Sequence, residues 1–298
     1  VTTDDTTIEY TDRHNIESHI IPNNESKYHK TEGVSQFLND DFVTSLGYHG
    51  EGPDTKKVLQ GIYDPPISAS QETREFLSAC RTDNKIPAPS VIRRYLNQRK
   101  SWKKRKEYTC TYNHHIGHFK SIFKDKRLSW FFFQRADIPE ISGYSPNRHR
   151  TCVDLMLMKK VASFDIADQR TIGILDTEFN QSNKRLGYEA MNLAMANSKI
   201  ANEQFAVKNI SAVHQIISRR CFVDHHHSKR KCFSICSNDL TGCYDRIVHT
   251  AAALALLRVG ISHNKIQSMF STIQRMCHRI RTTFGDSSVT WGGDNLGD

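Results

Sequence analysis

A short segment late in the sequence combines an acidic residue, a turn and an aromatic ring in an order that suits metal-dependent chemistry. Asp239 follows the apolar run Cys232–Cys236, which we predict to be a strand, and precedes a Thr-Gly pair that favours a tight turn. A carboxylate at the end of a strand can hold Mg²⁺ through a hard oxygen, and the carbonyl of Leu240 offers a second oxygen. Polymerases use two such ions for phosphoryl transfer. The alternative is structural, with Asp239 and Asp245 flanking a helix as an N-cap and a surface acid.

Cysteine and histidine residues gather between Cys221 and Cys236, where zinc is the metal to consider. If 232–236 is a strand, the sulfur atoms of Cys232 and Cys236 lie about 13 Å apart at ~3.3 Å per residue. That separation is too large for two ligands of one ion. We therefore favour buried cysteines beside a basic, histidine-rich loop over a zinc site.

Positive charge is concentrated in one block of the chain. The sequence has a formal net charge of +9 at pH 7. Residues 1–55 contain 3 Lys/Arg against 11 Asp/Glu, whereas residues 81–135 contain 15 Lys/Arg against 3 Asp/Glu. Because aromatic residues are interleaved with this positive charge, we expect the block to bind nucleic acid, with Lys103, Lys104 and Lys106 contacting phosphates. The alternative is a solvated helix face.

The elements that position these residues are predicted from apolar spacing, capping residues and glycines. We expect short strands at 156–161 and 171–175. Ser70 is the expected N-cap of one helix, and Gly260 lies just past the expected end of another. The predicted helices cover residues 70–80, 90–106, 178–198, 247–259 and 262–285.

Composition argues against two classes of protein. No apolar run approaches the ~20 residues that a membrane-spanning helix needs, so we expect no membrane partner. Residues 1–10 lack the basic and apolar regions of a secretory signal. The 8 cysteines show no disulfide framework, and we interpret them as reduced thiols of an intracellular protein, in the nucleus or the cytoplasm. Because the chain begins with Val1, we expect it to be a piece of a longer protein.

Several short motifs occur along the chain in an order that one polymerase family shares. Asp239 is followed five residues later by Tyr244, and the Glu203-Gln204-Phe205 element precedes both. Two further motifs lie upstream, around Lys160 and Arg170. The other matching segments are Gly117–Lys120, Gly143–Pro146, Asn180–Lys184, Ser268–Phe270 and Arg281–Asp286. In this order and spacing, residues 105–298 resemble the reverse transcriptase of non-LTR (LINE-like) retrotransposons.

The resemblance implies an α+β fold, with the fingers and an incomplete palm of a right-hand polymerase after a largely disordered N-terminal region. It implies that Asp239 and the carbonyl of Leu240 hold Mg²⁺ or Mn²⁺ and that Tyr244 excludes a ribose 2′-hydroxyl. Lys160 and Arg170 are then the residues that bind the triphosphate of the dNTP. The implied partners are an RNA template, a DNA primer and dNTPs, and no protein partner is evident.

This interpretation divides the chain into four parts: residues 1–55 are acidic and disordered, 56–135 form a linker and basic helical region, 136–231 are the fingers, and 232–298 are the N-terminal palm. Two departures affect the fingers, because Ala206 and Thr171 stand where the family has Gly and Pro. After Asp239 the sequence contains no Gln-Gly loop and no aromatic-x-Asp-Asp motif. We therefore expect RNA-directed DNA polymerisation in the full-length parent but not by this chain alone. The alternative function is a non-catalytic nucleic-acid-binding remnant of a decayed retroelement.

Overall fold

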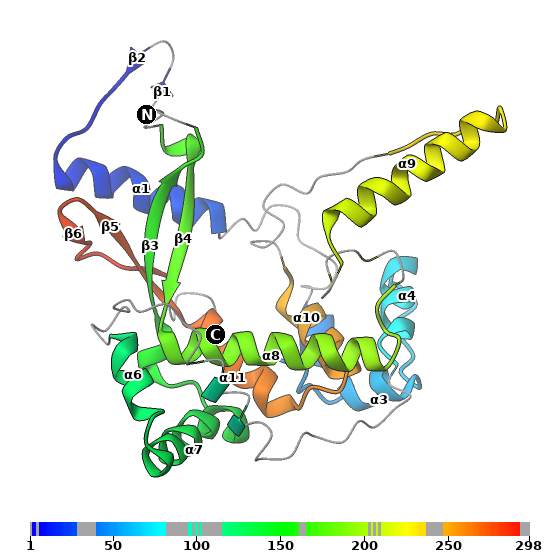
Figure 1. Ribbon diagram of the computed structural model, residues 1–298, viewed down its shortest axis with the longest axis horizontal. Coiled ribbons are helices and arrows are strands. Elements are labelled where there is room, and N and C mark those ends of the chain that lie inside the picture. Colours follow the sequence, from blue (N-terminus) through cyan, green and yellow to red (C-terminus); the bar gives the residue numbers. More distant parts are fainter. Residues whose placement is uncertain are drawn as a thin grey trace.

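The computed structural model describes residues 2–3, 6–28, 40–81, 95–96, 99–100, 102, 115–160, 165–201, 204, 207, 210–236 and 247–292. Its architecture is α+β, as expected, with helices accompanying a mixed five-stranded sheet (Figure 1). Two further strands, β1 (Thr2–Thr3) and β2 (Thr6–Thr7), pair only with each other. The helix expected over 90–106 lies largely outside the described residues. Among the residues described, every helix is too short or too polar to cross a lipid bilayer.

The sheet is built on a long hairpin. Strand β3 (Thr151–Met158) pairs antiparallel with β4 (Gln169–Leu175). The strand predicted at 171–175 is confirmed, whereas the one predicted at 156–161 is right only for its first three residues, because β3 begins earlier and ends at Met158. On its other side β3 pairs in parallel with β5 (Cys277–Thr282), which in turn pairs with β6 (Gly285–Asp286) and β7 (Trp291–Gly292). The hairpin rises from the layer of helices, and its connecting end lies far from α8 (Figure 1).

The N-terminal helix α1 (Arg13–Tyr28) lies beside this sheet, so the expectation that residues 1–55 are mostly disordered is wrong there. Asn24 is fully buried; its Nδ2 donates to Met156 Sδ at 3.7 Å, and its Oδ1 accepts from Thr171 Oγ1 at 3.2 Å. Arg13 Nη2 donates to the carbonyl of Asp286 at 2.8 Å. Polar side chains thus hold α1 on the sheet, which a search for apolar periodicity does not detect. Thr171 supplies one of these contacts.

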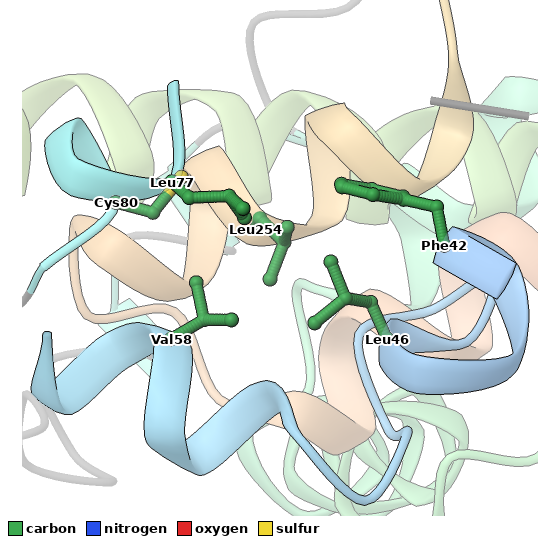
Figure 2. Close-up of a cluster of buried hydrophobic side chains, with 6 residues drawn as sticks. All are labelled: Phe42, Leu46, Val58, Leu77, Cys80 and Leu254. Atoms are coloured by element: carbon green, nitrogen blue, oxygen red, sulfur yellow. The ribbon is translucent and has the colours of Figure 1, made fainter. Parts of the chain in front are cut away.

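A second part of the N-terminal region belongs to a hydrophobic core. Helices α2 (Asp40–Leu46), α3 (Thr55–Gln60) and α4 (Gln71–Ala79) pack around α10 (His249–Arg258). Figure 2 shows their buried side chains converging on Leu254. The predicted helix at 70–80 is confirmed together with its cap, because Ser70 Oγ accepts from the backbone N–H of Thr73 at 3.2 Å.

Helix α10 continues into α11 (His263–Gln274), and both pack on α8 (Thr177–Ala196) through Leu186, Ala253, Ile266 and Phe270. The predicted helices at 178–198 and 247–259 are confirmed, and each of their ends agrees with the structure to within two residues. The third is only half right, because α11 ends at Gln274 and the segment after it forms β5. The apolar residues of this segment, Cys277 and Ile280, are three apart, as on a helix face, so it is the pairing with β3 that makes the segment a strand.

The remaining helices are α6 (Ile116–Ile122), α7 (Lys126–Ser142) and α9 (Ala212–Ser228). Helix α7 runs through the boundary placed between residues 135 and 136. Residues 232–236 form no strand: Phe233 stacks edge-on against Phe222 of α9, and Cys232 and Cys236 are exposed. The expectation of a buried strand with buried cysteines is therefore wrong. Each of these apolar residues alternates with a cysteine or serine, and no neighbouring strand of the described chain pairs with them.

Candidate functional site

The predicted functional residues divide into two groups. Lys160 and Arg170 are described, and both belong to the β3–β4 hairpin. The other positions lie outside the described residues, so their predicted roles stay predictions: Asp239, Leu240, Tyr244, Lys103, Lys104 and Lys106.

The hairpin brings Lys160 and Arg170 to its distal end. Arg170 stands opposite Leu157 in the β3–β4 ladder, and Lys160 follows β3 by two residues. The Lys160 ammonium lies 2.8 Å from a carboxylate oxygen of Asp168, and this hydrogen bond raises the pKa of Lys160. Arg170 is exposed, and none of the described carboxylates forms an ion pair with it. The Arg170 guanidinium is therefore available to an anion, whereas the Lys160 ammonium is shared with a surface acid.

A buried ionic network fixes the opposite end of the hairpin. Strand β4 passes directly into α8, whose N-cap Asp176 accepts from the backbone N–H groups of Glu178 and Phe179 at 2.8 and 3.1 Å. The carboxylate of Glu178 accepts from Arg135 of α7 and from Arg148 of the 3₁₀ turn Asn147–Arg150 that precedes β3. Both strands are thus tied to the helical layer at the end where they enter it.

The charges in this network are matched. Burial opposes ionisation of Glu178, but the neighbouring His149, Arg148 and Arg135 outweigh it and hold the pKa of this carboxyl below its usual value. His149 Nε2 lies 3.5 Å from Asp176 Oδ1. At neutral pH Glu178 is therefore an anion that anchors two cations.

A second group of side chains meets on the face of the sheet beside α1. Cys152 and Asp154 alternate along β3, and His278 stands next to Cys152 in the parallel ladder with β5. The Nδ1 atom of His278 lies 3.1 and 3.2 Å from the two oxygens of Asp154, and Cys152 Sγ lies 3.5 Å from Asp154 Oδ1. Burial raises the pKa of the Cys152 thiol far above its usual value, and the adjacent carboxylate adds to the effect. Among the described residues this is the one group of three cysteine, histidine or acidic side chains close enough to share a metal ion.

Sequence reasoning missed this second group. The Cys-x-Asp alternation was visible in the sequence but lay before the strand predicted at 156–161, and His278 was placed in a helix that was expected to continue to residue 285. Only the pairing of β5 with β3 brings these positions together, and no local pattern encodes a pairing between segments so far apart in the chain.

Comparison with known protein families finds none that matches this chain. No curated protein matches it either.

Proposed function

We propose that this chain is the fingers and N-terminal palm portion of a retrotransposon reverse transcriptase, an RNA-directed DNA polymerase that uses two metal ions in its full-length form. The supporting observation is the β3–β4 hairpin, which presents Arg170 and Lys160 at one end and is anchored by Glu178 at the other. The resemblance of the motif order supplies the reaction, and the hairpin supplies a physical role for the two cations.

The chemistry of the hairpin supports the proposed triphosphate binding. An arginine guanidinium can donate two parallel hydrogen bonds to phosphate oxygens, and the described part of the chain offers Arg170 no competing carboxylate. The Lys160–Asp168 pair is exposed, so it is weak and an incoming phosphate can displace the carboxylate. Seven consecutive residue pairs, from Cys152–Leu175 to Met158–Gln169, keep the backbone of the hairpin in one register. The cations are therefore carried on a rigid support, as positioning of a phosphoryl group requires.

The remaining roles in this proposal fall on residues known from the sequence. Asp239 and the carbonyl of Leu240 hold Mg²⁺ or Mn²⁺, and Tyr244 packs under the sugar of the dNTP. The RNA template and DNA primer lie along the basic block that contains Lys103, Lys104 and Lys106, where phosphate neutralisation releases counterions.

The test measures binding of Mg²⁺·dTTP to the chain by fluorescence competition or calorimetry. Replacing Arg170 with Ala is expected to weaken binding about tenfold or more, because hydrogen bonds to charged groups contribute ~1.5–3 kcal/mol. The matched control is Arg219→Ala, which removes another exposed arginine, from α9. Equal affinities of the two variants would overturn the assignment of the hairpin. Salt-sensitive RNA binding without any dTTP binding would favour the alternative, a non-catalytic nucleic-acid-binding remnant.

A further inference from the structure

The geometry points to a zinc site on the β3–β5 face of the sheet, with Cys152, Asp154 and His278 as its protein ligands. This inference is independent of the proposed polymerase function, because it concerns a different part of the hairpin and a different metal. It rests on the sheet register, the distances between ligand atoms, the space left by one glycine and the charge of a buried carboxylate.

The register places three different ligand types on one face. Residues two apart on a strand point to the same side, so Cys152 and Asp154 share a face. His278 joins them because it is the ladder partner of Cys152 on the neighbouring parallel strand. Cys152 and Asp154 are each 1% exposed, whereas the His278 side chain keeps 24% of its surface exposed. The histidine side is thus the route by which an ion from solvent reaches the two buried ligands.

The distances between ligand atoms fit a tetrahedral ion. With bonds of ~2.0 Å to nitrogen and oxygen and ~2.3 Å to sulfur, tetrahedral angles separate an N,O pair by roughly 3.3 Å and an S,O pair by roughly 3.5 Å. The corresponding distances here are 3.1 Å from His278 Nδ1 to Asp154 Oδ1 and 3.5 Å from Cys152 Sγ to Asp154 Oδ1. These two separations match those of a bound ion to within a few tenths of an ångström, and the ligand atoms of all three residues lie within 4.8 Å of one another.

The neighbouring strand leaves room for this arrangement. Gly173 of β4 stands opposite Asp154, and a methyl group there would lie 2.7 Å from Cys152 Sγ and 3.7 Å from Asp154 Oδ1. Any larger residue would thus collide with the sulfur atom. On the other side, the His278 ring stacks on Trp291 with ring centres 4.2 Å apart, which fixes the plane of the imidazole.

Charge and donor type select the metal. Asp154 is buried, and among the described ion pairs its one partner is His278, which carries a charge only when protonated. A buried carboxylate is costly without a compensating cation, and a divalent ion supplies that charge while leaving the imidazole neutral. A sulfur, nitrogen and oxygen donor set suits Zn²⁺, whereas Mg²⁺ takes oxygen ligands in octahedral geometry. Water completes the fourth position.

The experiment is a titration of metal-free chain with Zn²⁺ and, as a spectroscopic probe, with Co²⁺. The background is the chain with the exposed cysteines Cys221, Cys232 and Cys236 changed to Ser, which removes competing thiols beside the histidine-rich end of α9. We expect one Zn²⁺ per chain and, with Co²⁺, a thiolate-to-cobalt charge-transfer band. Asp154→Asn, which keeps the shape of the side chain, is expected to weaken Zn²⁺ binding by more than about 100-fold. A loss of this size exceeds that caused by changing a residue that contacts only the ligands and not the metal.

Two outcomes overturn the inference. One is the absence of saturable Zn²⁺ binding in the background chain, which would make the three residues a hydrogen-bonded cluster only. The other is unchanged affinity in a folded Asp154→Asn chain, with folding checked by circular dichroism. If that variant does not fold, Cys152→Ser in the same background gives the answer, because loss of this ligand should abolish the charge-transfer band. A band of unchanged intensity in the folded Cys152→Ser chain would also reject the site. Neither result depends on dTTP binding, so failure here is separate from failure of the polymerase proposal.

Discussion

Replacing Glu178 with Gln tests whether a buried anion holds the base of the hairpin. The change keeps the size of the side chain but removes the charge that Arg135 and Arg148 share. A hydrogen bond to a charged group contributes ~1.5–3 kcal/mol. The two arginine side chains are 43% and 39% exposed, so solvent screening places each contact at the lower end of that range. We expect the free energy of unfolding at pH 7 to fall by about 2–3 kcal/mol.

The dependence on pH makes this prediction specific. The folded-state pKa of Glu178 is depressed, so its contribution is present above the unfolded value of about 4.3 and is lost as the pH falls through the folded pKa. Urea unfolding of both chains at pH 7 and near pH 3 measures this loss. The difference between wild type and variant should shrink toward zero at the lower pH. The control Glu25→Gln changes an exposed acid and should shift stability by less than about 0.5 kcal/mol. A Glu178→Gln deficit of equal size at both pH values would refute the ionic explanation.

Three further predictions concern the core, a helix cap and the basic block. Leu254→Ala should lower the free energy of unfolding by about 2.7–5 kcal/mol, because Leu254 is fully buried where four helices meet. Urea unfolding measures this loss, and a loss below about 1 kcal/mol would contradict the packing in Figure 2. Ser70→Ala should cost about 1 kcal/mol in the same assay, and Ser70→Asp, which keeps a cap oxygen, should restore most of it. Reversing the charge of Lys103, Lys104 and Lys106 should weaken RNA binding and reduce its dependence on salt concentration. An unchanged salt dependence in a filter-binding assay would argue against phosphate contacts by these lysines.

Local signals in the sequence explain which elements could be predicted. The helix at α4 has a serine cap with an acidic residue in its first turn, and α10 ends at a glycine with φ of +95°. Such features depend on a few neighbouring residues, so they are visible without knowledge of the fold. Strand β4 was found for the same reason, because apolar residues mark it over a short span, whereas only the last three residues of β3 were predicted.

Elements defined by distant partners were missed. The segment at Cys277 has apolar spacing that also suits a helix, and it becomes β5 only because β3 offers an unpaired edge. The run at 232–236 has the composition of a strand, but it lies against α9 instead of a sheet. The Cys152–Asp154–His278 group depends on the first of these pairings, so it could not be predicted before the position of β5 was known.

The behaviour of α1 shows why composition misjudged the N-terminal region. Disorder is predicted from composition on the assumption that a segment must bury apolar surface to repay its loss of conformational entropy. The sheet face beside α1 itself offers polar atoms. Next to the Cys152–Asp154–His278 group, Met156 Sδ accepts a hydrogen bond from Asn24 and Thr171 Oγ1 donates one to it. A buried polar group must find hydrogen-bond partners, and Asn24 is such a partner for Thr171. An apolar helix in the same place would leave Thr171 without this hydrogen bond. A polar helix is thus the complement that this face requires, and the same polarity that makes residues 13–28 look unfolded in the sequence makes them suited to their place on the sheet.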